Sequence, residues 1–204
     1  MPIILKFLFY FLGTLSFTLL VVYLLLGFAK SLGIRSKNDI HVRWSNTSKP
    51  SLGGIAIFAS IFMAMIVYLI SHPTENIFGN ERFLFFFFGL SIAFFMGLAD
   101  DAFNTRPLIK LVTQILCGLS LVAGNLVIPL TNVFWMDSVV TVIWVVGLMN
   151  SLNMLDNMDG VTATISSLII AGIIMVLIIT GNKIFDFYML VLIGILGALI
   201  GFLK

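Results

Sequence analysis

The fold is decided by the stretch FLFFFFGLSIAFFMGLADD, which runs from Phe83 to Asp101. It is almost entirely apolar until it ends in two adjacent carboxylates, Asp100 and Asp101. A helix needs roughly 20 apolar residues to cross the hydrocarbon core of a bilayer. The stretch therefore predicts a membrane helix whose acidic end lies at a membrane surface.

The whole composition agrees with a membrane protein. The 204 residues are 60% hydrophobic and 10% charged, with a mean hydropathy of +1.16, whereas a soluble domain has about 25% charged residues. The size predicts one compact transmembrane domain over residues 1–204, and the net charge of +2 gives no reason to expect a nucleic-acid partner. Cys117 is the only cysteine, lies in an apolar stretch and is interpreted as a small packing residue.

The apolar segments predict an all-α, polytopic bundle of about seven membrane helices. The first run is too long for the core of a signal peptide, so we interpret it as a retained membrane helix. The third, fourth and fifth segments are short for a full span. The predicted helices cover residues 7–29, 52–70, 83–99, 108–124, 139–155, 161–180 and 187–202.

The distribution of basic residues predicts the orientation. If the N-terminus is outside, the cytoplasmic side carries eight of the 11 Lys and Arg residues and the outer side carries Lys6, Arg82 and Lys183. The positive-inside rule favours this arrangement, with the C-terminus in the cytoplasm. The acidic side chains of the candidate site then lie on the cytoplasmic face. No charged residue is left at a helix centre, which argues against a charged relay through the bilayer.

Two pairs of glycines predict close packing. Gly53 and Gly54 open the second helix and would allow its backbone to approach another helix or a ligand. Gly197 and Gly201 are spaced four residues apart, which suits helix packing in lipid.

The first candidate for chemistry is the pair Asp100 and Asp101. Adjacent carboxylates repel each other, and at the C-terminal end of a helix they also oppose the macrodipole. A divalent cation such as Mg²⁺ removes this repulsion by binding carboxylate oxygens together with substrate phosphates. The alternative is that both acids are simply solvated at the end of a helix.

The second candidate cluster lies near the end of the fifth helix. Asn150, Asn153 and Asn157 share one helical face, and Asp156 and Asp159 add two carboxylates before Gly160. Amides on that face can bind a sugar, a base or a phosphate ester. A plain Asn/Asp/Gly turn is the alternative, but it does not require asparagines inside a membrane helix.

Two lysines complete the predicted site. Lys110 begins the fourth helix and Lys49 precedes Pro50 and the Gly53-Gly54 pair. Each can bind a phosphate as a point charge, although snorkelling towards lipid headgroups explains either one alone. With the acids, they predict a site for a metal and a pyrophosphate.

Together these motifs resemble a known family. The blocks KPSLGGIAIF (residues 49–58), GLADD (97–101), KLVTQI (110–115) and NSLNMLDNMDG (150–160) are similar in order and spacing to those of the polyprenyl-phosphate N-acetylhexosamine-1-phosphate transferases, glycosyltransferase family 4. The family includes the enzymes that start peptidoglycan, O-antigen and teichoic-acid lipid intermediates. Each block alone is weak, and their combination is specific.

The resemblance implies a reaction and a cellular place. A polyprenyl phosphate, usually undecaprenyl phosphate, attacks the sugar-linked phosphorus of a UDP-N-acetylhexosamine, and UMP leaves. Mg²⁺ or Mn²⁺ is the implied cofactor, because phosphoryl transfer depends on positioned charge. The implied location is the bacterial inner membrane, with the active face cytoplasmic. N-acetylglucosamine is the favoured sugar, and a homodimer is left open.

The resemblance also implies roles for individual residues. Asp100 and Asp101 would bind the metal–diphosphate and are the candidate metal ligands. They form the catalytic acidic cluster with Asp156 and Asp159. Lys49, Lys110 and Asn153 would contact the nucleotide or phosphate.

The chain departs from the family at two points. Asn157 replaces a glycine common between the paired aspartates, which is mild because Asn tolerates left-handed turns. The family normally continues beyond the position of Lys204 with another aspartate block, a histidine-bearing loop and further helices. We therefore expect a C-terminally truncated member with little or no activity by itself.

Three other functions are alternatives to this transfer reaction. A prenyl-diphosphate enzyme favours Asp-Asp-x-x-Asp, but Asn104 stands at the fifth position. A CDP-alcohol transferase wants an Arg where this chain has Thr164. A membrane scaffold or transporter subunit stays open, although a transporter predicts polar residues at helix centres, and few are present.

Overall fold

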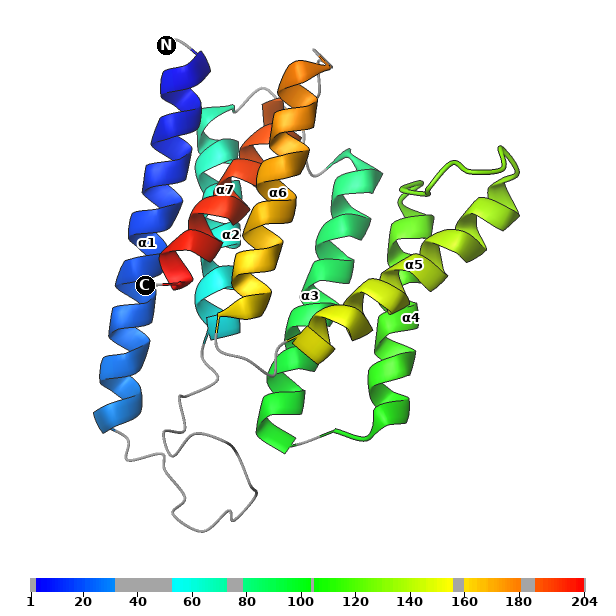
Figure 1. Cartoon of the computed structure of the whole chain (residues 1–204), viewed down its shortest axis with the longest axis horizontal. Coiled ribbons are helices and arrows are strands. Elements are labelled where there is room, and N and C mark those ends of the chain that lie inside the picture. Colours follow the sequence, from blue (N-terminus) through cyan, green and yellow to red (C-terminus); the bar gives the residue numbers. More distant parts are fainter. Residues whose placement is uncertain are drawn as a thin grey trace. The chain divides into compact units, whose positions relative to one another are not determined.

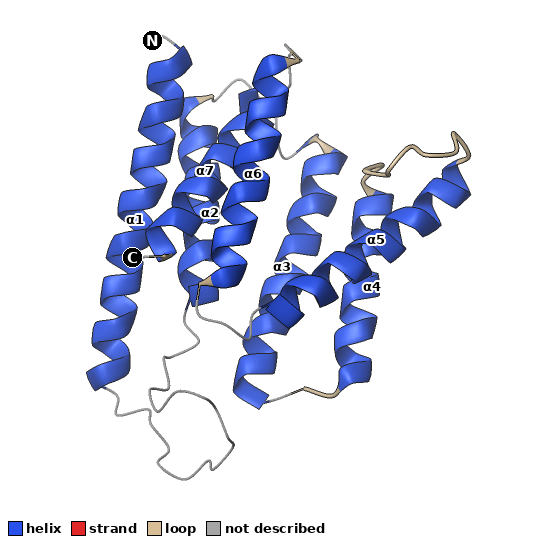
Figure 2. Cartoon of the chain, viewed as in Figure 1, coloured by secondary structure: helices blue, strands red, loops and turns tan. Residues whose placement is uncertain are grey.

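The computed structural model describes residues 3–31, 53–72, 79–103, 105–155, 160–180 and 186–203. These residues form seven helices and no strand (Figures 1 and 2). The all-α prediction is therefore confirmed for the described part of the chain. The helices are α1 (Ile3–Ser31), α2 (Gly53–Ser71), α3 (Glu81–Phe103), α4 (Pro107–Ala123), α5 (Phe134–Leu155), α6 (Val161–Ile179) and α7 (Asp186–Phe202).

Five of the helices are long and apolar enough to cross a membrane. They are α1, α2, α3, α5 and α6, while α4 and α7 are shorter apolar helices. Many large apolar side chains face outwards, such as Phe95, Trp144 and Leu168, which are 58–68% exposed. In water such a surface would be unstable, but lipid solvates it. The chain is a multi-pass helical membrane protein.

The predicted lengths of the third and fifth helices are wrong. α3 has 23 residues and α5 has 22, so both are long enough for a full span. The prediction ended α3 before Asp100 and began α5 after Ser138, because polar residues usually leave the hydrocarbon. In the structure Asp100 and Asp101 belong to the last turn of α3, and Asp137 belongs to the first turn of α5.

Asp137 also differs from its predicted place in an outer connection. Its side chain is only 3% exposed and accepts hydrogen bonds from the Thr131 backbone N–H and hydroxyl, each at 2.8 Å. The Leu130 N–H donates to the same oxygen at 3.2 Å. The carboxylate thus satisfies backbone donors of the connection before α5, which explains why the helix begins early.

The chain divides into two compact units, and each is described by itself. One contains residues 1–68 and 163–204, and the other contains residues 69–162. In the first unit, α1 packs closely against α7. A Cβ atom on Gly197 would lie 2.7 Å from the Phe11 carbonyl oxygen, and one on Gly201 would lie 2.9 Å from the Leu15 carbonyl oxygen. The predicted packing role of this glycine pair is confirmed.

The start of α2 is also in close contact with α7. A Cβ atom on Gly53 would lie 2.7 Å from Cζ of the Phe202 ring, whereas a Cβ atom on Gly54 would meet no other described helix within 4 Å. The predicted close approach therefore holds for Gly53, and its neighbour is a helix. Further along, the Thr18 hydroxyl donates to the Ser60 hydroxyl at 2.7 Å and joins α1 to α2 through two fully buried side chains.

The second unit contains α3, α4 and α5, and α4 packs against both of the others. Cys117 is buried, and its thiol lies 3.5 Å from the Gly89 carbonyl oxygen of α3, as expected for a small packing residue. The Ser120 hydroxyl donates to the Phe85 carbonyl oxygen at 2.5 Å. On the other side of α4, a Cβ atom on Gly118 would lie 3.0 Å from Cα of Val142 on α5.

Candidate functional site

Asp100 is the best-connected side chain of the candidate site. It lies in the last turn of α3, and its Oδ2 atom is 2.7 Å from the Lys110 ammonium at the start of α4. Its Oδ1 atom accepts hydrogen bonds from the Thr105 N–H at 3.1 Å and from the Thr105 hydroxyl at 2.8 Å. Asp100 therefore links the end of α3, the connection and the beginning of α4.

The ion pair explains how an acid can stand at the C-terminal end of a helix. The negative end of the α3 macrodipole disfavours a carboxylate there, and a nearby cation offsets that penalty. Lys110 supplies this cation, and the side chains of Lys110 and Asp100 are 31% and 26% exposed. The pair is thus open enough for a ligand to reach it, and Asp101 beside it is exposed.

A pair of amides lies one turn further along α4. Gln114 Nε2 donates to Asn150 Oδ1 at 3.1 Å, and Asn150 Nδ2 donates to Gln114 Oε1 at 2.9 Å. Gln114 is 8% exposed and Asn150 is exposed, so the two bonds are partly buried. The sequence predicted a ligand-binding face that included Asn150; in the structure the Asn150 amide binds the protein itself.

Asn153 follows Asn150 on α5 and is exposed. A residue three positions later lies on the same side of a helix, so Asn153 stands one turn closer to the end of α5 than the amide pair. Of the predicted site residues, Asp100 and Lys110 are in direct contact, and Asp101 and Asn153 belong to the same three-helix unit. Lys49, Asp156 and Asp159 lie outside the described residues.

Two residues that contact predicted site residues, Thr105 and Gln114, are not predicted from the sequence. Thr105 lies in a connection, where a Thr is usually interpreted as a turn residue. Gln114 lies in the KLVTQI block, but no structural or functional role is predicted for it from the sequence. Its signal was a long amide side chain within an otherwise apolar helix, four residues after Lys110 and therefore on the same face.

Asp100 and Asp101 are the described acids at the end of α3 that could bind a divalent cation. In the part of the chain that the structure describes, no three His, Cys, Asp or Glu side chains gather closely enough to hold a metal alone. Mg²⁺ commonly binds one or two carboxylates and completes its shell with water and substrate phosphates. Asp100 and Asp101 can supply those one or two carboxylates.

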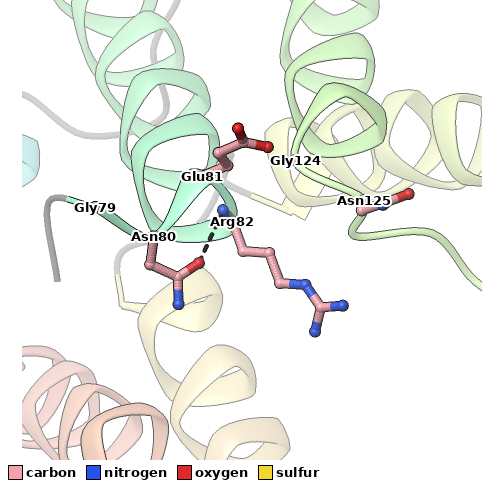
Figure 3. A pocket seen from close by; sticks show the side chains of 6 residues that line it. All are labelled: Gly79, Asn80, Glu81, Arg82, Gly124 and Asn125. Atoms are coloured by element: carbon pink, nitrogen blue, oxygen red, sulfur yellow. Dashed lines mark hydrogen bonds between the residues drawn. The ribbon is translucent and has the colours of Figure 1, made fainter. Parts of the chain in front are cut away.

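A separate hollow lies at the opposite ends of α3 and α4. It has a volume of about 450 Å³ and is lined by Gly79, Asn80, Glu81, Arg82, Gly124 and Asn125 (Figure 3). Asn80 Oδ1 accepts a hydrogen bond from the Arg82 N–H at 3.0 Å and so caps the first turn of α3. None of the predicted site residues lines this hollow.

Comparison with known proteins gives a family and several relatives. Residues 83–204 match the model of glycosyl transferase family 4. A probable undecaprenyl-phosphate N-acetylglucosaminyl 1-phosphate transferase of Bacillus subtilis is 27% identical over 144 residues, which are 66% of this chain and 38% of the relative. No solved structure matches the chain.

Two phospho-N-acetylmuramoyl-pentapeptide-transferases are also similar. The protein of Prochlorococcus marinus is 26% identical over 192 residues, or 84% of this chain and 51% of the relative. That of Streptococcus thermophilus is 26% identical over 198 residues, or 83% of this chain and 54% of the relative. The chain thus spans about half the length of the curated relatives it matches.

The family match covers more than half of the chain and includes Asp100, Asp101, Lys110 and Asn153. It confirms the resemblance that the sequence motifs indicate. The chain therefore belongs to glycosyl transferase family 4.

Proposed function

We propose that this protein transfers N-acetylhexosamine 1-phosphate from a UDP-sugar to a polyprenyl phosphate. An oxygen of the lipid phosphate forms a bond to the sugar-linked phosphorus, the bond from that phosphorus to the UMP oxygen breaks, and UMP leaves. A polyprenyl-diphosphate sugar remains in the membrane. Support comes from the family match and from the names of the relatives.

One observation in the structure carries the proposal. The carboxylate of Asp100 is held between the Lys110 ammonium and Thr105, within the region that matches the family. This places fixed charges of both signs at one end of α3 and α4. A phosphoryl transfer requires such positioned charge more than it requires covalent chemistry.

The proposed roles follow from the chemistry of each side chain. Asp100 and Asp101 would hold Mg²⁺ or Mn²⁺, which when bound neutralises the diphosphate charge. Lys110 and Asn153 would contact phosphate or nucleotide, since one is a point charge and the other a paired donor and acceptor. Lys49 would join them in substrate binding, and Asp156 and Asp159 would complete the catalytic acids. We propose that this face is cytoplasmic in a bacterial inner membrane.

The donor sugar is proposed to be N-acetylglucosamine and the acceptor undecaprenyl phosphate. The name of the Bacillus subtilis relative contains both groups. The Prochlorococcus marinus relative is named for an N-acetylmuramoyl-pentapeptide. A test with both donors therefore decides between them.

The test uses the chain in membrane vesicles with undecaprenyl phosphate and UDP-N-acetylglucosamine labelled at the sugar-linked phosphorus. Although the sequence predicts little or no activity for the chain by itself, any transfer that it performs should put label in the lipid fraction, release an equal amount of UMP, and stop when EDTA removes the metal. Asp100→Asn should lower turnover by about 10²-fold or more, because the substrate charge loses its positioned counterpart. Glu81→Gln at the other end of α3 is the matched control and should have parental turnover.

Binding is measured beside turnover because the chain spans about half the length of its relatives. Equilibrium binding of UDP-N-acetylglucosamine should require Mg²⁺ and should weaken in Asp100→Asn. A folded chain that shows neither binding nor transfer would contradict the proposal. A chain whose function in cells is unaffected by Asp100→Asn would instead be a scaffold.

A further inference from the structure

In the amide pair between α4 and α5, the Asn150 side chain uses both of its N–H donors within the protein. One N–H of the Asn150 amide donates to Gln114 and the other donates to the Val146 carbonyl oxygen at 3.0 Å. Asn150 Oδ1 accepts from Gln114. Since an Asn amide has two donors, none is left for a substrate. Asn150 is thus poorly suited to donate a hydrogen bond to a ligand.

The pair also fixes which residues of α4 and α5 lie opposite each other. Gly118 approaches Val142, and Gln114, four residues earlier on α4, binds Asn150, eight residues later on α5. The two helices therefore run in opposite directions. Apolar side chains in lipid can slide past one another at small cost, whereas a reciprocal amide pair is satisfied in only one register.

Because α4 and α5 are antiparallel, the residues one turn beyond the amide pair on each helix lie towards the candidate site. One turn from Gln114 towards the start of α4 is Lys110, and one turn from Asn150 towards the end of α5 is Asn153. Lys110 in turn holds Asp100 of α3. A slip between α4 and α5 would therefore shift Asn153 relative to the Asp100–Lys110 ion pair.

We propose that Gln114 and Asn150 are positioning residues: their amide pair sets the register of α4 against α5 and so brings Asn153 to the Asp100–Lys110 ion pair. The inference concerns residues that touch no substrate. Its catalytic consequence rests on the proposed function, but the register itself does not.

The experiment measures the register directly. Spin labels are attached at Ile109→Cys on α4 and Met154→Cys on α5, both at exposed positions, in a Cys117→Ser background. Pulsed electron resonance then gives the distance distribution between the labels. The parent should give one narrow distribution. Gln114→Leu and Asn150→Leu should each broaden it or shift it by up to about 5 Å, one helical pitch.

Three further variants distinguish a loss of helix register from an effect of removing a polar group. Gln114→Leu with Asn150→Leu removes both amides and leaves none unsatisfied, and it should still broaden the distribution. Gln114→Asn with Asn150→Gln exchanges the side chains and should restore the narrow one. Thr113→Val is the matched control on α4, because the Thr113 hydroxyl donates to the Ile109 carbonyl oxygen of its own helix and to no other helix of the described chain, and it should leave the distance unchanged.

Each result decides the proposal. Single variants with the parental distribution would overturn it, and so would a swapped pair that stays broad. If a single variant fails to insert, the swapped pair decides alone: a narrow distribution supports the inference and a broad one contradicts it.

Binding gives the second readout. Gln114→Leu should weaken Mg²⁺-dependent binding of UDP-N-acetylglucosamine by about tenfold or more, since small misplacements in a site are costly, and the swap should restore it. A parent that does not bind the nucleotide sugar would count against the proposed function while the distance result still tests the register.

Discussion

Asp100 divides its two carboxylate oxygens between different partners. Oδ2 forms the ion pair with Lys110, while Oδ1 receives both hydrogen bonds from Thr105. The Thr105 bonds fix the rotation of the carboxylate, because two donors from one residue reach the same oxygen. Thr105 therefore determines where Oδ2 points, although its own side chain carries no charge.

This arrangement predicts a graded effect at Thr105. Thr105→Val removes the hydroxyl donor to Asp100 but keeps the backbone donor, so we expect transfer to fall by about tenfold, the scale of one lost hydrogen bond to a charged group. Thr105→Ser keeps the hydroxyl and should be near the parent. The measurement is kcat/KM for label transfer to undecaprenyl phosphate, and equal rates for the Val and Ser variants would contradict the assigned role.

At the scale of the elements, the packing of α1 against α7 depends on glycines of α7 that have no side chain. A side chain on Gly197 would meet the Phe11 carbonyl oxygen at 2.7 Å and would overlap the Thr14 hydroxyl. Neither neighbour can move easily. The Phe11 carbonyl oxygen belongs to the backbone of α1, and the Thr14 hydroxyl donates to the Tyr10 carbonyl oxygen of the same helix at 2.9 Å. The two helix backbones approach closely only because the methyl group is missing.

Gly197→Ala should therefore destabilise the protein by about 1–3 kcal/mol, the usual cost of overpacking. Gly172→Ala on α6 is the matched control, because no neighbouring helix of the described chain comes within 4 Å of a Cβ at that position. There the change should be neutral or slightly stabilising, since Ala favours helices over Gly. Thermal unfolding in detergent measures both, and an equal Tm for the two variants would refute the packing argument.

The sequence predicts which helices exist far better than where they end or how they pair. Long apolar runs carry the first kind of information locally, so all seven helices are found. The end of α3 was misplaced because Asp100 looks like a loop residue until Lys110 and Thr105 are seen beside it. The contact between Gln114 and Asn150 joins residues from two helices, and no local pattern specifies which amides will meet.

For the molecule as a whole, sidedness in the membrane is the main property still predicted from charge alone. Eight of the 11 Lys and Arg residues fall on the side assigned to the cytoplasm, and the candidate site falls there too. The single domain over residues 1–204 also stays a prediction. The helices form two compact units, residues 1–68 with 163–204 and residues 69–162.

Labelling of the two ends of α4 tests the sidedness. In a Cys117→Ser background, Arg106→Cys stands before α4 and Asn125→Cys stands after it, and both positions are exposed. A membrane-impermeant maleimide added to intact cells should react with Asn125→Cys and spare Arg106→Cys until the membrane is opened. The reverse pattern would place the Asp100–Lys110 ion pair on the outer face.

The ring of Phe202 rests on Gly53, where α2 begins. Lys49, a predicted substrate contact, precedes that glycine by only four residues. The end of α7 and the start of α2 are therefore in direct contact, so a larger or smaller side chain in place of Phe202 would change the surroundings of the first residue of α2.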